Sequence, residues 1–520
     1  MDRNVHAPSP MLAIRLNLVI VIASMRRFIN KALWLVAHKI PWKPILIWGP
    51  WVIVLLVIAL YGFENWRGSR ALNKAQAQAA QAGVELDYQS YFPPTVPAEQ
   101  NILAGQPLLL MELNNLLWLS RSGIPELSSS GRDYRYENSR SLCVPDSIRS
   151  WLSSPASVSS EKEAANLILS LLGHRNSILQ TLDSFPDSQI FHLEFDDSDQ
   201  AVLRMDHFLH LGAVKNYHLL CYDDCRLAIA QGDSARAFRR ISQLLSSSEK
   251  FHGFSGWLEL YTLIDPIEKS EFLIWSALTN DLFDDPQLQN LLLKFEGIDV
   301  NARVEQATRK ALAHDLLYLD CAEANPETII AGWVGTKPSL PASISDLVSY
   351  YRHSAYQNLS PKGWLNQVRA RHIESHLRVL KALPVRSSND LKALEQVDLL
   401  NKKIEERWHP ARYRNFFPYL MSYLPDCSHG VAHTLTKKNI AIAGIQLELY
   451  RKKNGGYPES LTELDTQIPK DIFRDKAMEY TRFSPTEFTL ETTVLRRGAE
   501  QIFVEKELKT QVVWAIRRTD

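Results

Sequence analysis

Cysteine is scarce in this chain, and a net charge is missing. The five cysteines in 520 residues are Cys143, Cys221, Cys225, Cys321 and Cys427. An odd and low number of cysteines excludes a disulfide framework. Lysine and arginine together number 58, as do aspartate and glutamate, so the formal net charge is zero. No global field therefore draws the chain to nucleic acid, and we expect no nucleic-acid partner.

Sequence signatures of common catalytic sites are also missing. The chain has no P-loop and no G-x-G-x-x-G after a predicted strand. The stretch HGFSGW (His252–Trp257) lacks the G-x-S-x-G spacing of a nucleophile elbow. The stretch FDDSDQ (Phe195–Gln200) lacks the glycine and the distant glutamate of a calcium loop, so it predicts a polar turn. The sequence therefore assigns no catalytic and no cofactor-binding residue.

A first group of zinc-ligand residue types surrounds a predicted helix. Its members are His207, His210, His218, Cys221 and Cys225. Their spacing matches no established zinc pattern, and Cys221, Cys225 and Ile229 form one helix stripe that is typical of a core. A disulfide between Cys221 and Cys225 is awkward, because side chains one turn apart run parallel.

A second group, HIESH (His372–His376), looks like part of a zinc-protease helix. In H-E-x-x-H the glutamate adjoins the first histidine, whereas Glu374 lies two residues on and points to another face. No third ligand stands out downstream. The pattern predicts a solvated helical face, and no metal-binding residue is assigned.

The clearest positive feature is an uncharged apolar run of 20 residues, Pro44–Phe63. That length is needed to cross a bilayer core. Trp48 and Trp51 near one end, with Tyr61 and Trp66 near the other, resemble an aromatic belt. The alternative is a buried core helix, but the length and the flanks favour a single-pass transmembrane helix.

Basic residues are more numerous before this run than after it. Those before it are Arg3, Arg15, Arg26, Arg27, Lys31, Lys39 and Lys43, and those close behind it are Arg67, Arg70 and Lys74. This asymmetry predicts a cytoplasmic N-terminus and places residues 67–520 outside the cytoplasm. A shorter run, Leu16–Ser24, is too short to span and is predicted to be interfacial. Met25 begins a second basic leader and is an alternative start.

We divide the chain into five segments. They are a basic leader (1–43), the transmembrane helix (44–63), a helical and proline-rich connector (64–101), an α-helical body (102–433) and a small α+β domain (434–520). In the connector, NKAQAQAAQAGVELD predicts a short helix that leaves the bilayer, and the prolines of Tyr91–Asn101 favour an extended path.

The body reads as irregular helical hairpins. At the clearest break between two predicted helices, Gly232 can adopt the left-handed conformation that ends the first helix. Asp233 or Ser234 can cap the next one. Another loop followed by a capped helix start lies at Leu383–Glu395. The breaks follow no fixed period, so a regular solenoid stays an open alternative.

The last segment predicts one long helix and a small sheet. The helix, from about Thr434 to Lys453, is apolar most of the way round and is therefore expected to be buried on several sides. Asn454 and Gly455 favour a turn, Pro458 prevents the helix from resuming, and Ser460 with Glu463 has capping-box spacing. The stretches AMEYTRF and EFTLETTV predict a hairpin around Ser484–Thr486, to which QIFVE and QVVWAI can add strands.

This order of elements resembles the globular head of type II secretion major pseudopilins. The matching residues are Tyr450, Arg451, Gly456, Tyr457, Pro458, Leu461, Leu464, Pro469, Asp471, Phe473, Tyr480, Phe488 and Leu490. The resemblance implies a helix covered by an antiparallel sheet. The prepilin processing site and the acidic calcium loop of that family are missing, so the resemblance implies no calcium.

The whole chain resembles a set of bacterial membrane-anchored helical proteins that have no established activity. The shared features are Trp66-Arg67-Gly68, the proline-rich Pro93–Asn101, and the turn residues Gly232, Asp233 and Ala237. The resemblance implies a bacterial inner-membrane protein with most of the chain outside the cytoplasm. We expect a mainly α-helical interaction or scaffold protein with protein partners in the cell envelope. The alternatives are an accessory component of a secretion or pilus-like machine, and an envelope hydrolase with a dispersed site.

Overall fold

In a computed structural model, most described residues fall in seven stretches. These are 42–91, 206–252, 256–324, 361–408, 427–464, 468–495 and 509–516, with short pieces at 97, 100–101, 178–181, 183–184, 191–192 and 466. The expectations for the leader before residue 42, Cys143, FDDSDQ and QIFVE lie outside the described residues. The described parts belong to two compact units, Met1–Gly68 with Pro361–Gly363, and Ser69–Ser360 with Trp364–Asp520.

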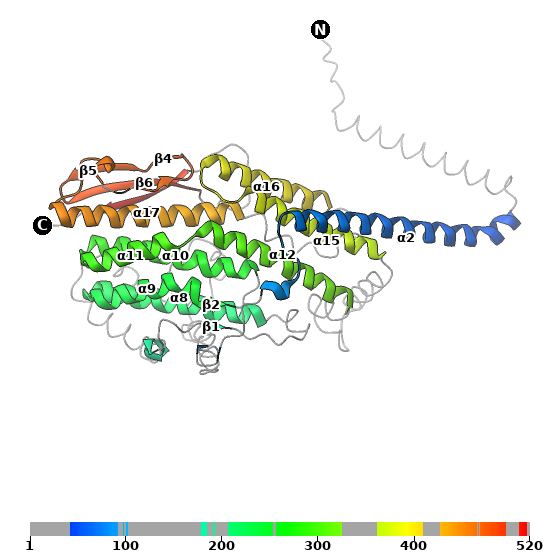
Figure 1. The fold of residues 1–520 in the computed structure, drawn as a ribbon, viewed down its shortest axis with the longest axis horizontal. Coiled ribbons are helices and arrows are strands. Elements are labelled where there is room, and N and C mark those ends of the chain that lie inside the picture. Colours follow the sequence, from blue (N-terminus) through cyan, green and yellow to red (C-terminus); the bar gives the residue numbers. More distant parts are fainter. Residues whose placement is uncertain are drawn as a thin grey trace, which may run out of the picture. The chain divides into compact units, whose positions relative to one another are not determined.

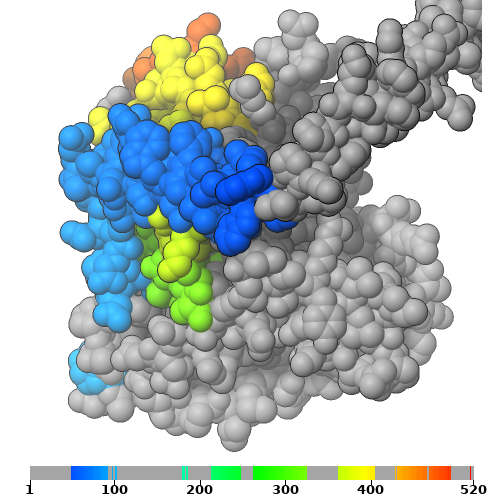
Figure 2. Space-filling model, turned by 90° about the vertical axis from the view of Figure 1, so that its right-hand side faces the viewer, coloured from blue at the N-terminus to red at the C-terminus, as the bar shows by residue number. Residues whose placement is uncertain are grey.

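The first unit contains most of the long helix α2, Trp42–Gln81. Its apolar side chains are exposed all around the helix, from Trp48 (65%) and Trp51 (64%) to Phe63 (54%) and Trp66 (57%). Helix α2 is drawn in blue in the space-filling view (Figure 2). By length and composition, this is one helix that could cross a membrane within the described part of the chain. The coarse prediction of a membrane-length helix is confirmed.

The helix predicted behind the apolar run is present, but it is the last part of α2 and not a short helix of its own. α2 continues without interruption to Gln81, and Gly83, with φ +63°, follows its end. The motif Trp66-Arg67-Gly68 therefore lies inside one helix. A Cβ atom on Gly68 would lie 2.1 Å from the carbonyl oxygen of Gly363. Glycine is needed at this position because the two backbones approach too closely for any side chain.

The second unit is mainly helical, as predicted. Its helices are α8 (Asp206–Gln231), α9 (Ser234–Lys250), α10 (Gly256–Thr279), α11 (Asp285–Gly297), α12 (Val300–Ala324), α15 (Lys362–Ala382, its first residues in the other unit), α16 (Ser388–Trp408) and α17 (Cys427–Asn454). Short pieces complete it: η1 (Tyr88–Tyr91), and a parallel pair of β1 (Phe191–His192) with β2 (Phe251–His252).

The α8–α9 hairpin forms as its sequence predicts. Gly232 has φ +71°, and the side chain of Asp233 accepts a hydrogen bond of 3.0 Å from the backbone N–H of Arg236. Cys221 and Cys225 are fully buried free thiols in the core. The prediction that they are core residues is therefore confirmed. Ser387 and Asp390 cap α16 reciprocally, with N···O distances of 2.9 and 3.3 Å, which confirms the second predicted helix start.

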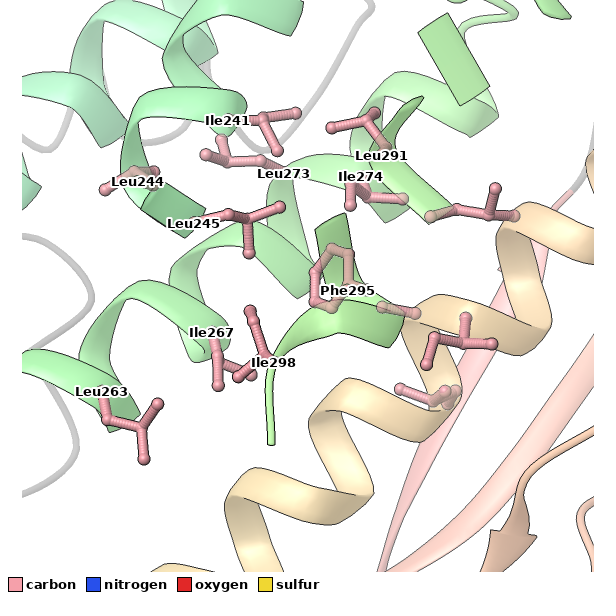
Figure 3. Packing of buried hydrophobic residues seen from close by; sticks show 14 of the residues in the cluster. Ile241, Leu244, Leu245, Leu263, Ile267, Leu273, Ile274, Leu291, Phe295 and Ile298 are labelled. Carbon is pink, nitrogen blue, oxygen red and sulfur yellow. The ribbon is translucent and has the colours of Figure 1, made fainter. Parts of the chain in front are cut away.

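Helix α10 is the centre of the hydrophobic core. Its buried Leu273 and Ile274 lie beside Ile241 of α9 and Leu291 and Phe295 of α11 (Figure 3). On its other side α10 packs against α17, which lies between the α10–α11 layer and the sheet (Figure 1). One continuous hydrophobic cluster therefore runs from the α8–α9 hairpin to the C-terminal sheet.

Helix α17 is buried on several sides, as predicted, although it begins earlier than expected, at Cys427. Ile440, Ala441, Ala443, Ile445 and Leu447 are all 0% exposed. This stretch of α17 has no solvent-exposed face, because the helical layer and the sheet both cover it.

The sheet has the order β5 (Glu479–Ser484), β6 (Glu487–Leu495) and β7 (Lys509–Ile516), all antiparallel. The predicted hairpin and the predicted strand QVVWAI are confirmed. Phe488 and Leu490 are buried against α17, whereas Tyr480 is half-buried and donates a hydrogen bond of 2.7 Å to the carbonyl of Pro458. A second small hairpin pairs β3 (Lys470–Asp471) with β4 (Lys476–Ala477).

The Gly-Tyr-Pro turn joins α17 to this sheet. Gly455 has φ +77°, which ends the helix. The ring of Tyr457 packs edge-on against Phe488 at 4.5 Å, and its hydroxyl donates to Glu448 at 2.7 Å. Gly456 leaves room for the β5–β6 turn, because a Cβ atom there would lie 3.2 Å from Cβ of Pro485.

Candidate metal centre

The second half of α2 belongs to the core of the second unit. Ala75 and Ala79 are 0% exposed and share a hydrophobic cluster with Leu312 of α12 and Ile373 of α15. The carbonyl of Gly83 accepts a hydrogen bond of 2.8 Å from the Arg309 guanidinium of α12. Alanine at these α2 positions permits close helix packing. This small core contains a buried polar site on α12 and α15.

That site consists of Asp315 on α12 and of His372 and His376, one turn apart on α15. Both histidines are 0% exposed and Asp315 is 4% exposed. The prediction of a solvated helical face at HIESH is therefore wrong. Positions i and i+4 share a helix face, and here that face is turned to α12 instead of to solvent. Glu374 points to a different face, as expected, and is only half-buried.

The two histidines converge on one carboxylate oxygen. Nδ1 of His372 lies 3.2 Å, and Nε2 of His376 3.7 Å, from Oδ2 of Asp315. Nδ1 of His376 lies 2.8 Å from the backbone carbonyl oxygen of His372. One ligand atom from each of the three residues lies within 4.8 Å of the others. These three residues could hold a metal ion.

Burial and the carboxylate act on these groups in opposite directions. Burial lowers the pKa of His376 to about 4, although the charge of Asp315 works against that shift. Burial raises the pKa of Asp315, but hydrogen bonds from His314 and His372 outweigh it and hold that pKa below its usual range. At neutral pH the cluster therefore combines a carboxylate with an uncharged His376 imidazole.

Sequence reasoning missed this cluster because it looked for the third ligand downstream of HIESH. Asp315 precedes His372 by 57 residues and lies on another helix. The available signal was the pair of histidines at i, i+4, which is also compatible with an exposed face. Only the packing of α15 selects between the two.

His218, a member of the first ligand group, lies in a different polar site. Its Nδ1 is 2.9 Å from Oδ2 of Asp265, and its Nε2 is 3.0 Å from the Ser247 hydroxyl. This order resembles a serine–histidine–aspartate relay. However, Ser247 is 0% exposed and donates to the carbonyl of Leu244 at 2.5 Å, so its oxygen is not presented to a substrate.

The other members of the first group do not join His218. Burial raises the pKa of Cys221 to about 12, so this thiol is protonated at neutral pH and is a poor metal ligand. Cys225 lies with its sulfur 3.5 Å from the carbonyl of Ala237. The side chains of His207 and His210 lie outside the described residues. Within the described part, the structure thus brings together none of the first group as ligands.

Comparisons with known proteins do not place the chain in a family. No family model matches it, and neither a curated protein nor a solved structure matches it. The likeness to pseudopilin heads therefore stays an expectation from the sequence.

Proposed function

We propose that this chain is a membrane-anchored interaction or scaffold protein of the bacterial inner membrane, with its body outside the cytoplasm. One observation carries the proposal. α2 is a single helix whose first part exposes apolar side chains on every side, while its second part contributes Ala75 and Ala79 to a buried core. The anchor and the first helix of the body are one element.

The chemistry of α2 supports an anchor more than a soluble helix. Leu55, Leu56 and Ile58 are each more than 60% exposed, at 64%, 64% and 61%. A row of exposed aliphatic side chains is unfavourable in water and favourable in lipid. The basic residues before Pro44 support an N-terminus in the cytoplasm. A helical body held at the membrane offers broad surfaces to protein partners.

A topology experiment tests this proposal. A reporter that is active only outside the cytoplasm is fused after residue 90, and a matched fusion is made after residue 40. We expect a signal from the first fusion alone, with the protein in the membrane fraction after an alkaline wash. Activity of a cytoplasm-only reporter fused after residue 90 would contradict the proposed orientation. Release of the protein by the wash would contradict the membrane anchor.

The α17–sheet region favours a second candidate, an accessory component of a secretion or pilus-like machine. Helix, Gly-Tyr-Pro turn and antiparallel strands follow in the order expected for a pseudopilin head, and Tyr457 joins them. The test is cross-linking in intact membranes followed by detergent pulldown. Recovery of secretion or pilus subunits by the full chain, lost when residues 434–520 are deleted, would favour this candidate over a general scaffold.

The alternative of an envelope hydrolase now has one specific observation, the Ser247–His218–Asp265 alignment. We expect a serine-reactive phosphonate to leave the protein unlabelled, because Ser247 is 0% exposed. Labelling that disappears in Ser247→Ala but persists in Ser242→Ala, on the same helix, would instead establish the hydrolase.

A further inference from the structure

Three buried side chains from two helices point to one spot. Asp315 comes from α12, and His372 and His376 come from α15. The role of this cluster does not depend on the scaffold function, because it concerns what holds these two helices together.

The two ring nitrogens of His376 both face hydrogen-bond acceptors. Its ring lies between two acceptors, the His372 carbonyl oxygen at 2.8 Å and Asp315 Oδ2 at 3.7 Å. A neutral imidazole has one N–H and can donate to only one of them. The short contact assigns this N–H to Nδ1, so the lone pair of Nε2 faces a carboxylate oxygen. Two electron-rich atoms that face each other in a buried site repel, and a cation between them would stabilise the arrangement.

The distances favour a metal ion over a proton. A charge-assisted N–H···O bond is about 2.7–2.9 Å long, and 3.7 Å between Nε2 of His376 and Asp315 Oδ2 is far outside that range. Nitrogen and oxygen ligands about 2.0–2.1 Å from a tetrahedral ion lie about 3.3–3.4 Å apart. The contacts of 3.2 and 3.7 Å that Asp315 Oδ2 makes to the two rings lie on either side of this value.

His372 faces the cluster through its Nδ1, 3.2 Å from Asp315 Oδ2. Its Nε2 is buried and has no hydrogen-bond partner among the described residues. Buried polar nitrogens are almost always paired. The ring is therefore positioned by its Nδ1 side, which faces Asp315.

We propose that Asp315, His372 and His376 bind one divalent transition-metal ion, Zn²⁺ or Fe²⁺. Two imidazoles and one carboxylate suit these ions better than Mg²⁺ or Ca²⁺, which require mostly oxygen ligands. The ion links α12 to α15 within the small core that also contains Ala75 and Ala79 of α2. Its primary effect is to stabilise this helix junction.

The test uses the full chain, purified in detergent under anaerobic conditions through an affinity tag that binds no metal. Elemental analysis should find about one metal ion per chain, and the element found distinguishes zinc from iron. Chelation should lower the Tm, and the returned ion should restore it, whereas Mg²⁺ should not. This measurement needs no variant and so does not depend on whether a variant folds.

Variants then locate the site. His376→Gln and Asp315→Asn should each lower metal content by about tenfold or more. His218→Gln is the matched control, since it removes another fully buried histidine beside a carboxylate, and it should keep the full metal content.

Two results would overturn the proposal. One is a wild-type protein that carries no metal as purified and shows no change in Tm with Zn²⁺ or Fe²⁺. The other is folded His376→Gln and Asp315→Asn proteins that retain the metal content of the wild type. Either result would make the cluster a hydrogen-bonded core network.

Discussion

Two buried regions of the second unit have different chemistry. In the α17–sheet region, Leu447, Phe488 and Leu490 fill the contact, and the interacting segments follow one another along the chain. In the α2–α12–α15 region, the same kind of helix packing encloses Asp315 and two histidines. The first region gains its stability mainly from apolar area, whereas the second is built around a buried carboxylate that must be satisfied. The two should therefore respond to different perturbations.

The largest effect is expected where a charge enters the apolar region. Leu447→Asp should cost more than about 4 kcal/mol, because it places an unpaired carboxylate at a position that is 0% exposed. Limited proteolysis should then remove the C-terminal sheet. Leu293→Asp on α11 is the matched control, since Leu293 is 68% exposed and should tolerate the change. Equal proteolysis of the two variants would show that Leu447 is not buried in this contact.

The α17–sheet region is also where prediction from the sequence went furthest. Gly455, Tyr457 and Pro458 act within a few residues of one another, and period-two patterning gave the β5–β6 hairpin. Such local patterns determine local structure. The sequence did not predict the early start of α17 at Cys427, because polar residues precede its apolar stretch. Tertiary packing extends the helix through them.

The α2–α12–α15 region was poorly predicted, for a physical reason. Helix α15 carries arginine, histidine and glutamate on several faces, so its sequence does not say which face is buried. The buried face is decided by partners far away in the chain, including Ala79 and Asp315. The continuation of α2 past Gly68 was missed similarly, since a glycine favours a helix break unless another backbone occupies the space beside it.

The second prediction removes the central charge of that polar region. Asp315→Ala should cost about 1–3 kcal/mol, because it leaves the buried Nδ1 of His372 without its partner. Asp320→Ala, on the same helix, is the control. The Asp320 side chain is 63% exposed and pairs with Arg369 at 2.6 Å, so its loss should cost less than about 1 kcal/mol. Urea unfolding measures both, and equal costs would contradict a special role for Asp315.

The third prediction concerns stability in acid and uses the buried His218. Its ring lies between the Asp265 carboxylate and the Ser247 hydroxyl, which can either donate or accept a hydrogen bond. Burial lowers its pKa, with Asp265 opposing that shift and Lys269 adding to it. Below a pH of about 6.5, His218 binds a proton more readily in the unfolded chain than in the folded protein. The free energy of unfolding should therefore fall as the pH is lowered. Asp265 has a lowered pKa and loses its contribution only in stronger acid.

Urea unfolding at pH 7 and pH 5 measures this effect. His218→Gln should show a smaller loss of stability between the two pH values than the wild type, because glutamine does not titrate. The ring of Tyr217, which lies 5.9 Å from that of His218, stays protonated at both values, since burial raises its pKa. An unchanged pH dependence in the variant would assign the acid sensitivity to other groups.

The smallest expected effect compares two tyrosine hydrogen bonds within the α17–sheet region, one to a charged acceptor and one to a neutral acceptor. The Tyr457 hydroxyl donates to the buried Glu448 carboxylate at 2.7 Å, whereas the Tyr480 hydroxyl donates to the neutral carbonyl of Pro458, also at 2.7 Å. Tyr457→Phe should cost about 1.5–2 kcal/mol and Tyr480→Phe about 0.5–1 kcal/mol, because a hydrogen bond to a charged group is worth more.

Both substitutions keep the ring, so packing against Phe488 is preserved and the difference reports on the acceptor. Arg451 also pairs with Glu448, at 2.7 Å, which limits the cost of leaving that carboxylate with one donor fewer in Tyr457→Phe. Thermal unfolding of Tyr457→Phe, Tyr480→Phe and the double variant gives the two costs and their sum. If Tyr480→Phe cost as much as Tyr457→Phe, the charge of Glu448 would contribute nothing to this turn. The stability of the α17–sheet region would then rest on apolar area and on hydrogen bonds of ordinary strength, in contrast to the buried charge of the α2–α12–α15 region.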